Sequence, residues 1–140
     1  MDAQKLTQKS LEAVGQAQSL AIEHSNMQIE QEHLFYALLT QENGLIPQLF
    51  KKMGIDTAGL EQAVQEKMTQ IPGVTGPGRE PDKVYVSQNV DAALVQAEKE
   101  AARMKDEYVS VEHLMLGLMN KPNRALQDIF QWFGIKADAF

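Results

Sequence analysis

The chain has 140 residues, of which 44% are hydrophobic and 23% charged, and it carries a formal net charge of −6 and no cysteine. This length predicts one compact domain, and the acidic balance argues against binding to nucleic acid, whose phosphates attract basic surfaces. No apolar run approaches the ~20 residues of a membrane span, and the first residues lack a signal-peptide pattern, so we expect no membrane association and a cytoplasmic location.

Two helices are predicted at the start of the chain. The first runs from Thr7, a favourable N-cap residue, to about His24, because apolar residues recur along it at three- and four-residue spacing. The second follows Ile29, and the carboxylates of Glu30 and Glu32 in its first turn favour the positive end of the helix dipole.

Two more helices complete the first half of the chain. The third carries Pro47 within its first turn, where a missing amide hydrogen costs nothing. It ends at Gly54, because glycine readily adopts the left-handed conformation that stops a helix. The fourth is capped by Asp56 or Thr57. Residues 7–70 are therefore predicted to form a unit of four helices.

A segment rich in proline and glycine, residues 71–83, predicts a linker. A second set of helices begins beyond it with Ser87 as the N-cap, and Ser110 caps the next helix of this set. The second unit is therefore predicted to cover residues 87–140.

The two units repeat one another at a constant distance of 80 residues, as from His33 to His113. The repeated segments are Glu32-His33-Leu34-Phe35-Tyr36-Ala37-Leu38-Leu39 with Glu112-His113-Leu114-Met115-Leu116-Gly117-Leu118-Met119, and Gly54-Ile55 with Gly134-Ile135. Such a repeat predicts an all-α, pseudo-twofold duplication of a four-helix repeat, since each copy has an apolar face that it cannot bury alone. An equal second copy would end about ten residues beyond Phe140, so we expect a fragment whose eighth helix is missing or reduced to a turn.

The sequence resembles a known family over essentially its whole length. The likeness is carried by the paired Glu-His-Leu helices, the Gly-Ile that ends each third helix, and two longer segments. These are Ile71-Pro72-Gly73-Val74-Thr75-Gly76 and Asp106-Glu107-Tyr108-Val109-Ser110-Val111-Glu112-His113-Leu114. Together they resemble the N-terminal domain of Clp-type AAA+ unfoldases, and among these most of all the ClpB disaggregases.

The resemblance implies a noncatalytic substrate-capture domain that is tethered ahead of two ATPase modules in a hexamer. In that family the domain binds unfolded or aggregated polypeptide and passes it to the AAA+ ring for disaggregation and refolding. ATP and magnesium are expected only in those modules, because this chain has no Gly-Lys phosphate loop. The domain by itself is expected to be a monomer.

Two other functions stay open at this point. The first is docking of a folded adaptor protein, as in the related ClpA and ClpC unfoldases that feed a protease. The second is a stand-alone helical signalling or antibiotic-binding protein built on the same duplicated fold.

Polypeptide is expected to bind in a groove at the seam between the two copies. The candidate residues are Thr7, Asp106 and Glu112, which match family positions associated with substrate engagement, with Leu94, Tyr108 and Val109 as an apolar floor. The structural alternative is that Thr7 is only a helix cap, that Glu112 is only a favourable acid near a helix start, and that the apolar residues are only core.

His33 and His113 are candidates for a metal or acid–base site, because each follows a glutamate. Adjacent residues on a helix point to different faces, however, and do not share a metal ion. We therefore interpret both as structural histidines, with no metal site. Without a cysteine or a nucleophile motif, the chain is not expected to be an enzyme.

Two further features have structural interpretations. The methionines on apolar stripes are predicted to fill the core, and they are Met53, Met104, Met115 and Met119. Trp132 lies off the apolar stripe of the last helix and is expected to rest on the missing eighth helix.

Overall fold

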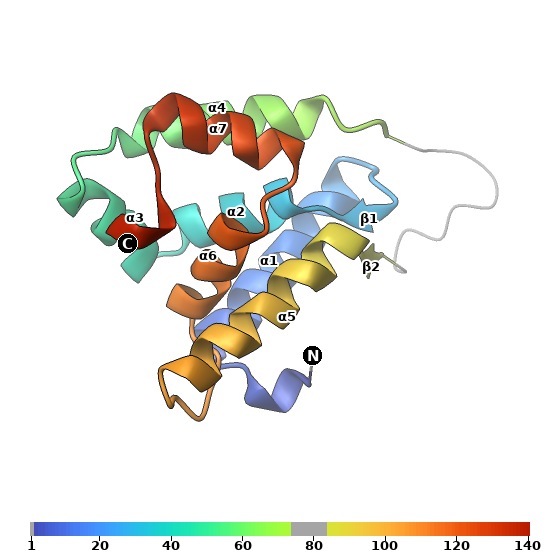
Figure 1. Ribbon diagram of the computed structural model, residues 1–140. Coiled ribbons are helices and arrows are strands. Elements are labelled where there is room, and N and C mark those ends of the chain that lie inside the picture. Colours follow the sequence, from blue (N-terminus) through green and yellow to red (C-terminus); the bar gives the residue numbers. More distant parts are fainter. Residues whose placement is uncertain (1, 74–83) are drawn as a thin grey trace.

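The computed structural model describes residues 2–73 and 84–140, and these residues fold mainly into helices (Figure 1). The α-helices are α1 (Gln8–Glu23), α2 (Gln31–Thr40), α3 (Leu45–Lys52), α4 (Thr57–Thr69), α5 (Gln88–Arg103), α6 (Val111–Asn120) and α7 (Arg124–Phe133). The strands are β1 (Gln28–Ile29) and β2 (Tyr85–Val86), and the 3-10 turns are η1 (Ala3–Lys5) and η2 (Ala137–Ala139). The all-α fold class is therefore confirmed, with a single turn after α7.

Part of the predicted linker, residues 74–83, lies outside the described residues. Within the two described ranges, no helix is both long and apolar enough to cross a membrane.

The predicted caps begin the helices in both halves. Thr7 Oγ1 accepts a hydrogen bond from the Ser10 amide at 3.2 Å, and Ser87 Oγ accepts one from the Val90 amide at 3.1 Å. Each bond satisfies one of the amide groups that have no partner within the helix. The two caps are equivalent under the 80-residue repeat, so the same local signal starts α1 and α5.

The predicted glycine stops end the third helix of each half. Gly54 follows α3 with a φ of 79°, and Gly134 follows α7 with a φ of 69°. Beyond these glycines, the Ile55 amide donates to the Phe50 carbonyl at 3.0 Å, and the Ile135 amide donates to the Phe130 carbonyl at 2.8 Å. This pairing satisfies orphan carbonyls at the helix end, which explains why both copies require glycine there.

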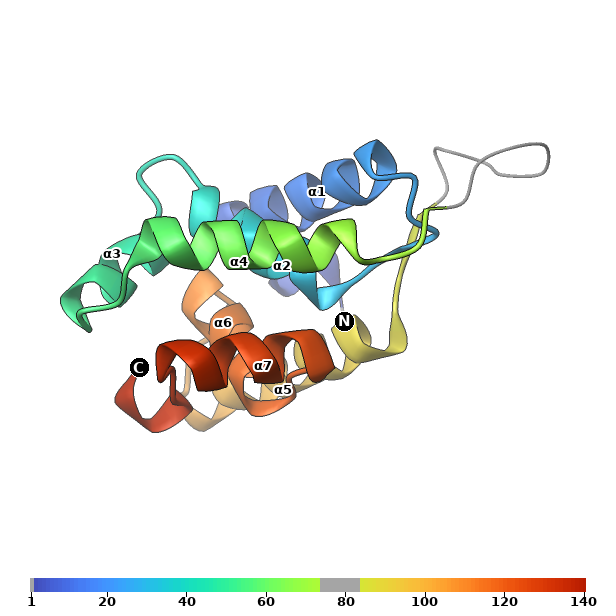
Figure 2. The same cartoon turned by 90° about the horizontal axis from the view of Figure 1, so that it is seen from above.

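The two halves form two layers that share one core. Figure 2 shows helices α1, α2 and α4 of the first half lying over α5, α6 and α7 of the second half. Phe35 of α2 is fully buried, and its ring centroid lies 6.3 Å from that of Phe50 and 5.4 Å from that of Phe130. Because Phe130 belongs to the second half, these edge-to-face contacts join the halves across the layer boundary.

Short backbone pairings also join the halves, and they occur twice. β1 pairs in parallel with β2, and the Ser87 amide donates to the Ile29 carbonyl at 3.0 Å. At the equivalent place, Leu6 forms a parallel bridge with Val109, and the Thr7 amide donates to the Val109 carbonyl at 3.1 Å. The seam between the copies therefore exists in two related versions.

A buried glutamine adds a polar link that only the first copy possesses. Gln31 is fully buried, and its Nε2 donates to the Asn89 and Lys121 carbonyls at 2.8 Å each. Its Oε1 accepts from the Asn123 amide at 2.8 Å. The equivalent residue of the second copy is Val111, which has no polar side-chain atom, so the link is not duplicated.

Helices α5 and α6 pack closely enough to require a glycine between them. A Cβ added to Gly117 would overlap the Ala93 carbonyl and would lie 3.2 Å from the Ala97 amide nitrogen. The equivalent residue in the first copy is Ala37, so the two copies do not pack their helix pairs identically.

Most of the predicted core residues are buried, with one clear exception. Met115 is fully buried and Met119 is 9% exposed, whereas Met104 is 43% exposed. The prediction that Met104 fills the core is wrong, because it is the C-cap residue of α5, where the chain leaves the helix. Trp132 is 85% exposed on α7.

Candidate functional site

We call the pairing of Leu6 with Val109 the first seam and the pairing of β1 with β2 the second seam. The first seam contains Thr7 and Val109. The Val109 amide donates to the Lys5 carbonyl at 2.8 Å, and the Val109 carbonyl accepts from the Thr7 amide at 3.1 Å and from Ser10 Oγ at 2.9 Å. The Thr7 hydroxyl in turn donates to Ser10 Oγ at 3.0 Å. The Thr7 hydroxyl is therefore engaged both as a donor to Ser10 Oγ and as an acceptor from the Ser10 amide, as expected of a helix cap.

The turn between α5 and α6 presents a continuous exposed surface beside this seam. All five residues from 104 to 108 are exposed, and we call them the turn surface: Met104, Lys105, Asp106, Glu107 and Tyr108. Met104 and Tyr108 are 43% and 51% exposed, so two large apolar side chains lie among three charged ones. Lys105 has a φ of 60°, which reverses the chain at the end of α5.

Asp106 is held by His113 from the first turn of α6. Its Oδ2 accepts from His113 Nε2 at 2.9 Å, and His113 Nδ1 accepts from the Ser110 amide at 2.9 Å. Because Nδ1 accepts a backbone N–H, the proton of the neutral imidazole must be on Nε2, which then donates to Asp106. The Asp106 side chain remains half exposed.

The first copy repeats this arrangement with Asn26 in place of Asp106 and Glu30 in place of Ser110. His33 Nδ1 accepts from the Glu30 amide at 2.8 Å, and His33 Nε2 lies 2.8 Å from Asn26 Oδ1. Burial, with a smaller effect of nearby His24, lowers the pKa of His33 to about 4. Both histidines thus cap a helix start. Among the described residues, no group of three or more His, Asp or Glu side chains is arranged to hold a metal ion.

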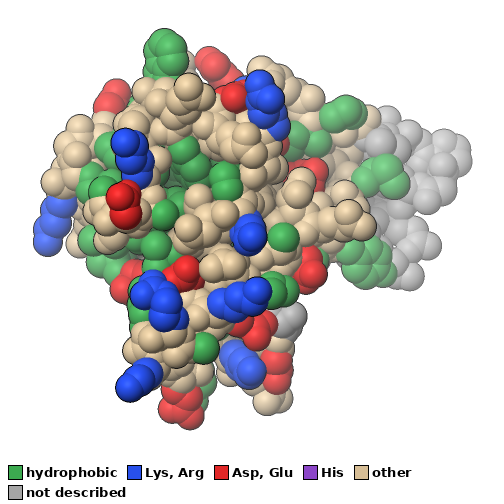
Figure 3. Space-filling model, in the orientation of Figure 1, with side chains coloured by type: hydrophobic (Ala, Val, Ile, Leu, Met, Phe, Trp, Pro, Cys, Tyr) green, Lys and Arg blue, Asp and Glu red, His purple; other side chains and the backbone are tan. Residues whose placement is uncertain are grey.

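Glu112 lies apart from the seam, in a hollow of about 390 Å³ that we call the Glu112 hollow. Its lining comes from four elements and consists of Leu49, Arg103, Met104, Glu112, Leu116, Ala137, Asp138 and Phe140. Figure 3 shows hydrophobic side chains reaching the surface near the C-terminus, with charged side chains around them. Met104 belongs both to this hollow and to the turn surface, so the two are adjacent.

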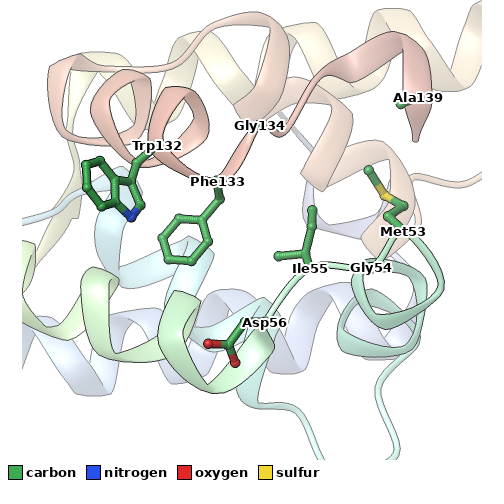
Figure 4. A pocket seen from close by; sticks show the side chains of 8 residues that line it. All are labelled: Met53, Gly54, Ile55, Asp56, Trp132, Phe133, Gly134 and Ala139. Carbon is green, nitrogen blue, oxygen red and sulfur yellow. The ribbon is translucent and has the colours of Figure 1, made fainter.

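A second hollow, of about 540 Å³, is also lined in part by η2 and was not predicted from the sequence. We call it the Trp132 hollow, and its lining is Met53, Gly54, Ile55, Asp56, Trp132, Phe133, Gly134 and Ala139. In Figure 4 the Phe133 ring and the Ile55 side chain point into the space between the end of α7 and the turn at Gly54. The repeated Gly-Ile pair was the signal that these two turns lie in equivalent places.

Five of the six predicted site residues occupy three environments, and the sixth, Leu94, belongs to the hydrophobic core. Thr7 and Val109 pair at the seam, next to Asp106 and Tyr108 of the turn surface, whereas Glu112 lines its own hollow. Val109 is 3% exposed and Leu94 is 9% exposed, so neither offers much side chain as an apolar floor in this conformation. Their role in binding stays a prediction.

Comparisons with known proteins show the family to which the chain belongs. A family model described as the Clp repeat (R) N-terminal domain matches residues 5–133. The chaperone protein ClpB of Clostridium tetani is 36% identical over 140 residues, which is 100% of this chain and 16% of that protein. The chain thus spans about one sixth of the length of this curated relative.

Two solved structures have the same fold. The Hsp104 N-terminal domain from Candida albicans superposes with a TM-score of 0.82 at 24% identity, covering 96% of this chain and 85% of that one. A ClpV N-domain in complex with a VipB peptide gives a TM-score of 0.74 at 18% identity, covering 96% and 81%. At these identities the likeness extends to the fold alone.

Proposed function

Because the chain belongs to the Clp repeat (R) N-terminal domain family, we propose that it is a noncatalytic domain that captures unfolded polypeptide for a ClpB-type chaperone. In this proposal the domain binds unfolded or aggregated clients and passes them to an AAA+ ring. The ring, its assembly as a hexamer and its ATP hydrolysis belong to modules that this chain does not contain, and they are part of the proposal.

The observation that carries the proposal is the exposure of Met104 and Tyr108 on the turn surface. Unfolded polypeptides differ from folded ones because they expose apolar side chains. These side chains bind to exposed apolar groups on another protein. The adjacent Glu112 hollow extends the apolar area with Leu49 and Leu116. That a ClpV N-domain of the same fold forms a complex with a peptide also supports binding of extended chains.

Binding through this surface is expected to be weak and tolerant of client sequence. An apolar side chain contributes about 1.5 to 3 kcal/mol when fully buried, and the ordering of an unfolded chain offsets much of that gain. A shallow surface with few apolar anchors should therefore give dissociation constants of roughly micromolar or weaker.

NMR titration of the ¹⁵N-labelled chain tests where clients bind. The probe is reduced, carboxymethylated α-lactalbumin, which cannot fold, and native α-lactalbumin is the folded control. We expect amide shifts at Thr7, Met104, Tyr108 and Glu112 with the unfolded probe alone. If these amides do not move, or if native α-lactalbumin moves them equally, the proposed function is wrong.

Docking of a folded adaptor is the second candidate, and the Trp132 hollow is the observation that favours it. An 85% exposed tryptophan beside a concave surface is typical of a specific protein contact. In that case one folded partner should bind with nanomolar affinity, and Trp132→Ala should weaken it strongly while leaving the unfolded probe unaffected.

A further inference from the structure

The bond between Asp106 and His113 closes the turn that carries Tyr108. Asp106 lies in the middle of the turn surface and His113 lies in the first turn of α6, and their side chains meet at 2.9 Å. The Asp106 amide also donates to the Ala101 carbonyl at 2.8 Å, which ties the residue to the end of α5. Asp106 therefore connects the two helices on either side of the turn surface.

The first copy shows that this connection does not depend on a charge. Asn26 is equivalent to Asp106, its amide donates to the Ala21 carbonyl at 2.9 Å, and its Oδ1 accepts from His33 Nε2. Ser25 precedes it with a φ of 57°, as Lys105 precedes Asp106 with a φ of 60°. A neutral amide oxygen therefore holds the same turn in the same way as a carboxylate.

We propose that Asp106 is a positioning residue, which holds the turn surface through His113 and does not itself contact the bound polypeptide. This inference rests on the proposed function. Its physical basis is that Oδ2 is occupied by the histidine and that the seam beside it depends on the same turn. The Val109 amide of that turn reaches the Lys5 carbonyl at 2.8 Å, so a displaced turn would also loosen the seam.

Three variants of the whole chain test the proposal. Asp106→Asn keeps an acceptor oxygen for His113 and reproduces the first copy, whereas Asp106→Ala removes the acceptor. Glu107→Gln is the matched control, because it removes one negative charge from an exposed neighbour in the same turn. Fluorescence anisotropy with labelled, reduced and carboxymethylated α-lactalbumin measures affinity. Two-bond ¹H–¹⁵N spectra report the His113 ring nitrogens, and amide hydrogen exchange at Val109 reports the seam.

We expect Asp106→Asn and Glu107→Gln to stay within about twofold of the original dissociation constant. Asp106→Ala should weaken binding at least about fivefold, because the dissociation constant rises as the fraction of molecules with the turn in its binding conformation falls. The Ser110 amide should keep the His113 proton on Nε2 in every variant. Only Asp106→Ala should shift the His113 Nε2 resonance, because Nε2 loses its acceptor, and only this variant should accelerate exchange at Val109.

Two results would overturn the positioning role. One is that Asp106→Asn weakens binding as much as Asp106→Ala while the His113 and Val109 signals stay unchanged, which would mean that the client contacts the charge directly. The other is that Asp106→Ala leaves exchange at Val109 unchanged. Exchange at Val109 is measured without any client, so it tests the positioning role alone. If the original chain does not bind the probe, that result counts against the proposed function instead.

Discussion

Phe130→Ala perturbs the contact that joins the two halves of the fold. Phe130 is 7% exposed, and its ring centroid lies 5.4 Å from that of Phe35 with the planes at 76°. Truncation removes most of a buried ring and leaves a cavity, which should cost about 3 to 5 kcal/mol of unfolding free energy. A domain of this kind typically has only ~5 to 15 kcal/mol, so a large share of the stability should be lost.

A double-mutant cycle separates the contact between the rings from the general loss of burial. Phe35→Leu, Phe130→Leu and the double variant should give a coupling free energy of about 0.5 to 1.5 kcal/mol, the usual range for an edge-to-face aromatic pair. Trp132→Leu is the matched control on the same helix. Because Trp132 is 85% exposed, its replacement should change the unfolding free energy by no more than about 0.5 kcal/mol.

Urea denaturation followed by far-UV circular dichroism gives these free energies, and calorimetry shows whether the halves unfold together. The shared core predicts one transition. Tryptophan fluorescence would be a poor local reporter, because the exposed Trp132 changes its surroundings little on unfolding, so amide exchange at Leu34 and Leu114 should be compared instead. Two separate transitions, or a cost below about 1 kcal/mol for Phe130→Ala, would refute the idea of one core.

Three further substitutions probe other features of the fold. Gly117→Ala should destabilise the chain by about 1 to 3 kcal/mol in urea denaturation because the added Cβ meets backbone. Gly15→Ala, in open space on α1, should instead stabilise it by about 0.5 to 1 kcal/mol, and a loss at both sites would contradict the argument. Gln31→Leu should cost about 1 to 3 kcal/mol, because it removes three part-buried hydrogen bonds that join the halves, and a neutral result would show that the link is dispensable. Finally, the pKa of His33 is lowered from 6.5 to about 4, so the unfolded chain binds more protons between these values, and stability should fall as pH falls across this window by up to about 3 kcal/mol. Denaturation of His33→Gln at several pH values should give a flatter dependence, and an unchanged slope would assign the effect to other groups.

The 80-residue repeat made the helix boundaries predictable, because each local signal occurred twice. Thr7 and Ser87 both begin a helix with a side-chain oxygen, and Gly54 and Gly134 both end one in the left-handed conformation. Two independent occurrences of a weak signal are more specific than either alone. The fold class followed from this pattern before any contact was known.

The pairing of β1 with β2 could not be predicted in the same way. Strands of two residues are too short to show an alternating pattern, and their partners lie on opposite sides of residues 71–83. The seam is therefore formed by tertiary contacts that the local sequence pattern does not reveal. The same limit applies to the candidate site, since Glu112 in the first turn of α6 lines a hollow that does not include Tyr108, although the two residues are close in sequence.

Paired substitution of two exposed tyrosines tests the central claim, which is that polypeptide is captured through the turn surface. Tyr108 is 51% exposed beside the first seam, and Tyr85 is 70% exposed at the second seam, so they match in chemistry and accessibility. Anisotropy with the unfolded α-lactalbumin probe should show at least about fivefold weaker binding for Tyr108→Ser and a change within about twofold for Tyr85→Ser. Equal losses for both variants, or no loss for Tyr108→Ser, would contradict capture at this surface.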